Sequence, residues 1–153
     1  MSLSCIVQGH PTNHTIRIMK TDWESAVENL AERDGRYRKE AFFFVYHALD
    51  FTVKKMGLTE VELEKRHVTG RDLLLGISEY AFDLFGPLTQ EVLSHWRVHQ
   101  TRDFGEIVFA LVEGDLMGKT ERDSIEDFID VYDFVEEFDW RKRRAAQQSA
   151  KKS

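Results

Sequence analysis

Three short amphipathic segments follow one another over residues 68–116, separated by capping and turn residues. Thr69 and Thr101 stand where helices begin, and Gly86 with Pro87 stands where one helix ends and the next begins. Threonine caps a helix by accepting a backbone hydrogen bond, glycine closes the last turn, and proline fits the first helical position. This order of elements is typical of a helix-turn-helix or winged-helix unit. We therefore expect a mainly α, compact domain of about four to five helices, with a winged-helix-like second half and at most a small β-hairpin.

A helix is predicted most strongly over residues 39–56. Its apolar residues recur at spacings of three and four: Ala41, Phe42, Phe44, Val45, Ala48, Leu49, Phe51, Val53 and Met56. A helix that is apolar around most of its girth has to be covered by neighbours on several sides. We therefore expect this helix at the centre of the fold, preceded by a helix that begins at Thr21 or Asp22 and ends at Gly35.

The segment after residue 116 supports two interpretations. Residues 116–120 and 127–132 can pair as a wing-like hairpin. Alternatively, residues 124–138 can form irregular chain that packs its aromatic side chains onto the helices. We favour the irregular chain, with a little strand in it.

The ends of the chain differ from its middle. Residues 1–18 show no periodicity and are predicted to be a disordered leader or a misassigned start, because ordered pattern begins directly after Met19. Residues 19–140 are predicted to form the single globular domain. Residues 141–153 are predicted to form a basic, disordered tail.

Composition narrows the class of protein. Of 153 residues, 42% are hydrophobic and 31% charged, as in ordinary globular domains. No apolar run approaches the ~18–20 residues that a membrane span needs, so no membrane insertion is expected. The single cysteine, Cys5, cannot form an internal disulfide, which favours a reducing, cytoplasmic location. Since the chain also lacks a Gly-rich phosphate loop and a Cys-x-x-Cys motif, we expect no cofactor.

Charge is distributed unevenly along the chain. The formal net charge is −6, but residues 121–139 hold nine acidic residues against Arg122 alone, a net charge of −8. Residues 141–153 hold six basic residues and no acid, a net charge of +6. Blocks of like charge are most often solvated faces or tails. A further interpretation is that the basic tail lies on the acidic segment of its own chain or of a neighbouring copy.

Several short motifs resemble an uncharacterised bacterial family of small single-domain proteins, of planctomycete type, with no assigned function. They lie at residues 67–81, 85–88, 103–109, 118–124 and 132–134, so the resemblance covers roughly residues 20–138. Arg97 and Ile125 depart from the family pattern, which has glycine and a basic residue there. Because the family has no known catalytic residues, the resemblance implies no site.

A winged-helix-like fold raises the possibility of nucleic-acid binding. A winged helix reads DNA with the helix after its turn, here residues 101–113. That helix carries Arg102 but also Asp103, Glu106 and Glu113. Affinity for DNA depends on neutralising phosphates with Lys and Arg, so this helix would repel the DNA backbone. Specific DNA binding is therefore not expected, and weak nucleic-acid binding through the basic C-terminal tail stays as an alternative.

Metal binding has one candidate pair. His95 and His99 are four residues apart, a spacing that puts two imidazoles on one helix face. The helix is predicted to end between them near Arg97, and no third ligand is evident in the sequence. A structural or surface role is therefore favoured, and no metal site is predicted.

Catalysis has the thinnest support in the sequence. No nucleophile elbow or di-iron motif is present, and catalytic residues stay unassigned. His67, Tyr80, Asp103 and Glu106 form a candidate pocket for a small enzyme of unknown chemistry, if they converge. The sequence therefore does not decide whether the protein is an enzyme, and it favours a non-enzymatic protein.

Binding to another protein is the function we favour from the sequence. Phe128, Tyr132, Phe134 and Phe138 lie among carboxylates and form a candidate partner surface, in which aromatics supply burial and acids select a basic approach. The competing interpretation is that these rings pack on the chain's own helices. We expect a non-enzymatic, cytoplasmic interaction or regulatory module that binds a protein partner or a second copy of itself.

Overall fold

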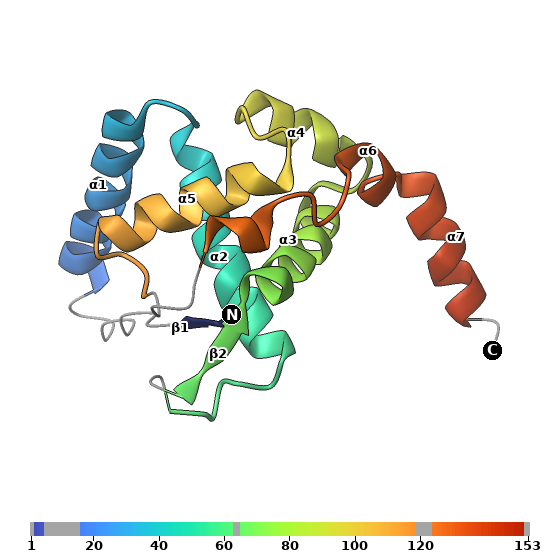
Figure 1. Cartoon of the computed structure of the whole chain (residues 1–153), viewed down its shortest axis with the longest axis horizontal. Coiled ribbons are helices and arrows are strands. Elements are labelled where there is room, and N and C mark those ends of the chain that lie inside the picture. The colour runs from blue at the N-terminus through green and yellow to red at the C-terminus, as the bar shows by residue number, and fades with distance from the viewer. Residues whose placement is uncertain (1, 5–15, 63–64, 119–123, 152–153) are drawn as a thin grey trace.

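The computed structural model describes residues 2–4, 16–62, 65–118 and 124–151, and within these ranges the chain is mainly helical (Figure 1). The elements in chain order are β1 (Ser2–Ser4), α1 (Ile16–Asp34), α2 (Lys39–Lys55), β2 (His67–Thr69), α3 (Gly70–Phe85), the 3-10 helix η2 (Gly86–Leu88), α4 (Thr89–His95), α5 (Thr101–Glu113), the 3-10 helix η3 (Ile125–Phe128), α6 (Phe134–Glu137) and α7 (Trp140–Lys151). A search of the described residues found no helix with the length and apolar character that a membrane crossing needs.

Helix α2 is covered on several sides, as its apolar pattern predicts. It contacts α1, α3 and α5, and it runs behind α5 in Figure 1. Its buried residues are Ala41, Phe42, Phe44, Val45, Tyr46, Ala48, Leu49, Thr52 and Val53. The closest approach is to α3, where a Cβ atom on Gly76 would overlap the hydroxyl oxygen of Thr52. Glycine at residue 76 therefore sets how closely the two helices pack.

The capping prediction is confirmed at α3 and wrong at α5. Thr69 accepts a hydrogen bond from the Asp72 amide at 3.0 Å, and the Asp72 carboxylate accepts one from the Thr69 amide at 3.2 Å. At α5 the N-cap residue is Gln100, not Thr101. Thr101 is buried and donates its hydroxyl to the carbonyl of Phe128 at 2.6 Å, because the chain returns across the start of α5.

The junction between α3 and α4 follows the prediction. Gly86 has a φ of +50°, which glycine adopts without strain, and its amide donates to the carbonyl of Phe82. Pro87 lies in the first turn of η2, where a missing amide costs nothing. The hydroxyl of Thr89 then donates to the carbonyl of Gly86 at 2.7 Å. Helix α4 follows directly.

The predicted wing is not found in the described residues. Residues 116–118 and 124–138 contain no strand, and residues 119–120 of the predicted hairpin lie outside the described ranges. The strands that do pair are β1 and β2, which are antiparallel with Leu3 opposite Val68. The winged-helix-like arrangement is therefore not confirmed, and residues 124–138 instead form η3, α6 and connecting turns.

Both predicted disordered ends contain regular structure. Ser2–Ser4 form β1, and α1 begins at Ile16, before the predicted start at Thr21 or Asp22. Residues 5–15 of the predicted leader lie outside the described residues. At the other end, where a disordered tail was expected, α7 is a helix that extends away from the rest of the fold (Figure 1).

Candidate functional site

Helix α7 forms because it is capped and its composition suits a helix. The Asp139 carboxylate accepts hydrogen bonds from the amides of Arg141 and Lys142, at 2.9 and 3.4 Å, as an N-cap residue does. Alanine, arginine, lysine and glutamine dominate the helix, and all four are strong helix formers. Within the segment predicted to be a disordered tail, the structure therefore has a helix over Trp140–Lys151, because Asp139 caps a run of helix-forming residues.

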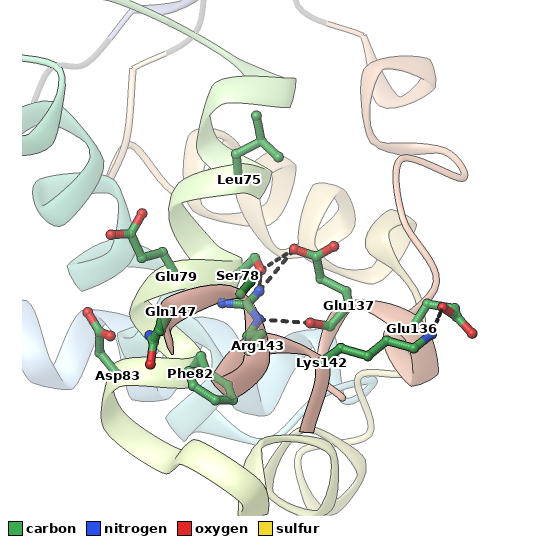
Figure 2. Close-up of a pocket in the computed structure, with 11 residues that line it drawn as sticks. Leu75, Ser78, Glu79, Phe82, Asp83, Glu136, Glu137, Lys142, Arg143 and Gln147 are labelled. Carbon is green, nitrogen blue, oxygen red and sulfur yellow. Dashed lines mark hydrogen bonds and ion pairs between the residues drawn. The ribbon is translucent and has the colours of Figure 1, made fainter. Parts of the chain in front are cut away.

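Arg143 joins α7 to the rest of the fold (Figure 2). Its guanidinium donates to the carbonyl oxygen and to the carboxylate of Glu137, both at 2.9 Å, and also to the hydroxyl of Ser78. That hydroxyl in turn donates to the Glu137 carboxylate at 2.6 Å. The guanidinium carbon lies 4.8 Å from the ring centre of Phe82, a cation–π distance. One arginine therefore links α7, α6 and α3.

A second ion pair lies beside Arg143. Lys142 donates to the carboxylate of Glu136, and this hydrogen bond, followed by the Coulomb attraction of the same carboxylate, raises the pKa of Lys142. The charge distribution of the sequence is compatible with a contact between the basic tail and the acidic segment of the same chain. Lys142 with Glu136 and Arg143 with Glu137 make that contact at the root of α7.

An open groove of about 600 Å³ lies between α3, α6 and α7. Its apolar residues include Leu75, which is 51% exposed, Phe82 and Ala146. Acidic side chains line it as well, among them Asp83 and Glu79 on α3, and Glu79 also pairs with a lysine of α2. The groove therefore offers apolar surface beside carboxylates and the basic root of α7.

The outer surface of α7 is basic. Arg141, Arg144, Gln148 and Lys151 are spaced at three, four and three residues, so they share one face of the helix; we call them the basic stripe. All four are exposed, and no ion pair joins them to a carboxylate within the described part of the chain. The three charges of the stripe are therefore available to another molecule.

The four residues of the candidate catalytic pocket do not form one cluster. Asp103 and Glu106 lie together on α5, whereas His67 is exposed in β2. Tyr80 stacks against Phe44 with ring centres 5.4 Å apart. The structure thus brings together only the two residues that share a helix.

Asp103 and Glu106 tie α5 to the turn between α1 and α2. Asp103 accepts the Tyr37 hydroxyl at 2.8 Å and the His99 amide at 2.8 Å. Glu106 accepts from the guanidinium of Arg36 at 3.0 Å. Burial first, and then the hydrogen bond to Asp103, raises the pKa of Tyr37. These contacts hold two segments together, which is a structural task.

The candidate partner surface is corrected, since its rings lie inside the fold. Phe128, Phe134 and Phe138 are at most 9% exposed. Tyr132 is half-buried, and its hydroxyl donates to the carbonyl of Leu74 at 2.8 Å. This burial agrees with the competing interpretation, in which the rings pack on the chain's own helices. Burial and this hydrogen bond make the segment part of the core.

The two histidines considered for metal binding lie on separate elements. His95 ends α4 and His99 precedes α5, and Arg97 between them has a φ of +67°, so the helix stops there as predicted. Among the described residues, no group of three or more His, Cys, Asp or Glu side chains is placed to hold a metal ion.

Sequence reasoning did not identify Ser78, Glu137 and Arg143 as a unit. Ser78 is 59 residues from Glu137 and 65 from Arg143, so no local spacing connects them. The one local signal was Asp139, an N-cap residue directly before a run of helix formers.

Comparisons with protein-family models, with curated proteins and with solved structures each found no match. The resemblance to an uncharacterised bacterial family therefore stays a prediction.

Proposed function

We propose that this chain is a non-enzymatic interaction module that binds a protein partner through α7 and the groove beside it. The observation that carries the proposal is that α7 has no buried residue. An isolated helix of this length is marginal in water, so its stability has to come from contacts. Arg143 and Lys142 supply contacts at one end of α7, and a partner would supply them along the rest.

The surface defines the chemistry of the partner. The basic stripe favours carboxylates, and Leu75 and Phe82 favour an apolar side chain that enters the groove. The partner is therefore an acidic protein surface that carries at least one exposed apolar residue. The reducing cytoplasm is the proposed setting, supported by the single cysteine, Cys5.

Two alternatives have less support. An enzyme would need its acid and base groups together, whereas Asp103 and Glu106 are engaged in structural contacts. Nucleic acid would also be attracted by the basic stripe. However, Leu75 and Phe82 give the groove beside α7 an apolar surface that suits a protein side chain and that a phosphate backbone does not use.

The test is a capture experiment with matched charge variants. Tagged wild-type protein, R141E/R144E and the control R33E/K39E are each exposed to native lysate, and bound proteins are identified by mass spectrometry. The control makes the same change in net charge at exposed residues of other helices. We expect a protein that wild type and control retain and that R141E/R144E loses.

The captured protein is then purified and titrated against all three forms at low and high salt. Binding should weaken at high salt, because exposed charges are screened. Equal binding by R141E/R144E and wild type would refute the role of α7. Salt-sensitive binding of α7 to a labelled DNA duplex or RNA strand, without any protein, would favour the nucleic-acid alternative instead.

A further inference from the structure

An acidic recess is separate from the groove beside α7, and the two share no lining residue. It occupies about 470 Å³ between the start of α3 and η3. The carboxylates of Glu126, Asp127 and Asp130 line it, against the single base Arg71. Ile129 lies among them and is 41% exposed, so its side chain is accessible to a partner. The recess therefore has the chemistry of the proposed partner surface: carboxylates around an exposed apolar residue.

The basic stripe carries the complementary chemistry. Arg141 and Arg144 stand beside Trp140, whose side chain is 36% exposed at the start of α7. The Arg141 guanidinium carbon lies 5.4 Å from the ring centre of Trp140, so charge and aromatic surface are presented together. Aromatic residues and arginines of this kind are the commonest anchors of protein interfaces.

The stripe cannot reach the recess of its own molecule. In Figure 1, α7 leaves the fold beyond α6 and runs away from η3. Within α7, Lys142 and Arg143 form ion pairs with acidic residues of the same chain, and these are Glu136 and Glu137 at the root of the helix. Within the described part of the chain, neither surface therefore covers the other, and both are available to a second molecule.

We propose that the basic stripe of one molecule docks on the acidic recess of a second copy of this chain. This inference rests on the proposed function, because it names the partner for the same helix. Trp140 packs against Ile129 in this contact, and Arg141 and Arg144 meet Glu126 and Asp130. If two molecules exchange their α7 helices reciprocally, both contacts form in one closed dimer.

The experiment is a charge exchange between two variants. R141E/R144E makes the stripe acidic, and E126K/D130N makes the recess basic, because Arg71 and the new lysine then outnumber Asp127. Asparagine is used at residue 130 because the φ there is +49°, which asparagine tolerates. Each purified variant is sedimented alone and mixed with the other over a concentration series, at about 50 mM and about 500 mM salt. Circular dichroism and thermal unfolding check that each variant is folded.

We expect wild type to associate at low salt and to dissociate at high salt. Each variant alone should associate at least tenfold more weakly. The mixture should regain association, because an acidic stripe then meets a basic recess and a wild-type stripe meets a wild-type recess. The control R33E/K39E should behave as wild type.

Two results would overturn the inference: wild type that stays monomeric at every concentration, or folded variants whose mixture gains nothing over each alone. Their meaning for the proposed function differs. If wild type is monomeric but captures a protein from lysate that R141E/R144E fails to capture, the second copy is excluded as the partner and the proposed function stands. If wild type is monomeric and R141E/R144E captures the same proteins as wild type, both the second copy and the proposed function are excluded.

Discussion

Replacement of Arg143 by alanine is expected to release α7 while the rest of the fold stays intact. Arg143 makes the hydrogen bonds to Glu137 and Ser78 and the cation–π contact with Phe82 that connect α7 to α6 and α3. Alanine has at least the helix propensity of arginine, so the substitution does not weaken the helix itself. Any loss of order in α7 would therefore come from the lost contacts.

The size of the effect follows from the exposure of the groups. The side chains of Arg143 and Glu137 are 22% and 30% exposed, so their ion pair is worth about 1 kcal/mol, at the upper end for a surface pair. The cation–π contact with Phe82 adds about 1 kcal/mol. A loss of about 2 kcal/mol raises the undocked population of α7 about 30-fold.

Hydrogen exchange measures this population directly. Amides of α7 should exchange about 30-fold faster in Arg143→Ala, while those of α2 keep their wild-type protection. Arg144→Ala is the matched control, because Arg144 lies next to Arg143 on the same helix and is exposed. If both variants exchange alike in α7, Arg143 does not hold the helix and the reasoning fails.

Packing and titration give three more expected outcomes. Gly76→Ala should lower the free energy of unfolding by about 2 kcal/mol in urea, because overpacking against Thr52 costs about 3 kcal/mol and helix propensity returns about 1. Adding Thr52→Ala should recover part of that loss, and strict additivity of the two substitutions would argue against the clash. Gly105→Ala should increase hydrogen exchange in η3, since the new Cβ would lie 2.6 Å from Cγ of Phe128; an unchanged rate would contradict this. Burial raises the pKa of Tyr132 above its ordinary 10.0, so the unfolded state loses this proton first and the free energy of unfolding should fall as pH rises above 10. Tyr132→Phe should make that fall shallower, and an identical pH profile would exclude Tyr132 as a cause.

The sequence predicts helix α2 and the start of α3 correctly, because both depend on residues that are close together in the chain. The continuous apolar surface of residues 39–56 predicts a covered helix, and α2 is one. Thr69 with Asp72 predicts a helix start, and the capping box is formed. In both cases the interacting groups are within a few residues of one another, so their spacing in the sequence is enough.

The errors arose where distant segments decide the structure. Thr101 is a good N-cap residue by type, but the carbonyl of Phe128 takes its hydroxyl, 27 residues away. The aromatic residues of the segment 124–138 fit a partner surface by type, because the sequence does not show which helices of the same chain cover them. Likewise, nothing in the spacing of Ser78 and Arg143 indicates that they meet. Contacts of this kind depend on how the helices pack, which one sequence does not contain.

The packing of α5 adds a second reason to reject it as a DNA-reading helix. The first reason is charge, because Asp103, Glu106 and Glu113 outnumber Arg102. In the structure, η3 lies across α5 and contacts it closely at Gly105, while α2 covers it from another side. Of its thirteen residues, only Arg102 and Glu113 are exposed.

A helix that enters a groove of DNA needs a free face along several turns. Helix α5 has none, whereas the basic stripe of α7 is exposed from Arg141 to Lys151. Basic substitutions at Asp103 or Glu106 would therefore not create DNA binding, because both side chains are half-buried and engaged with Tyr37 and Arg36. Among the described residues, the stripe of α7 offers an exposed basic helix face to an acidic macromolecule, and this is why the proposed experiments change the charges of α7.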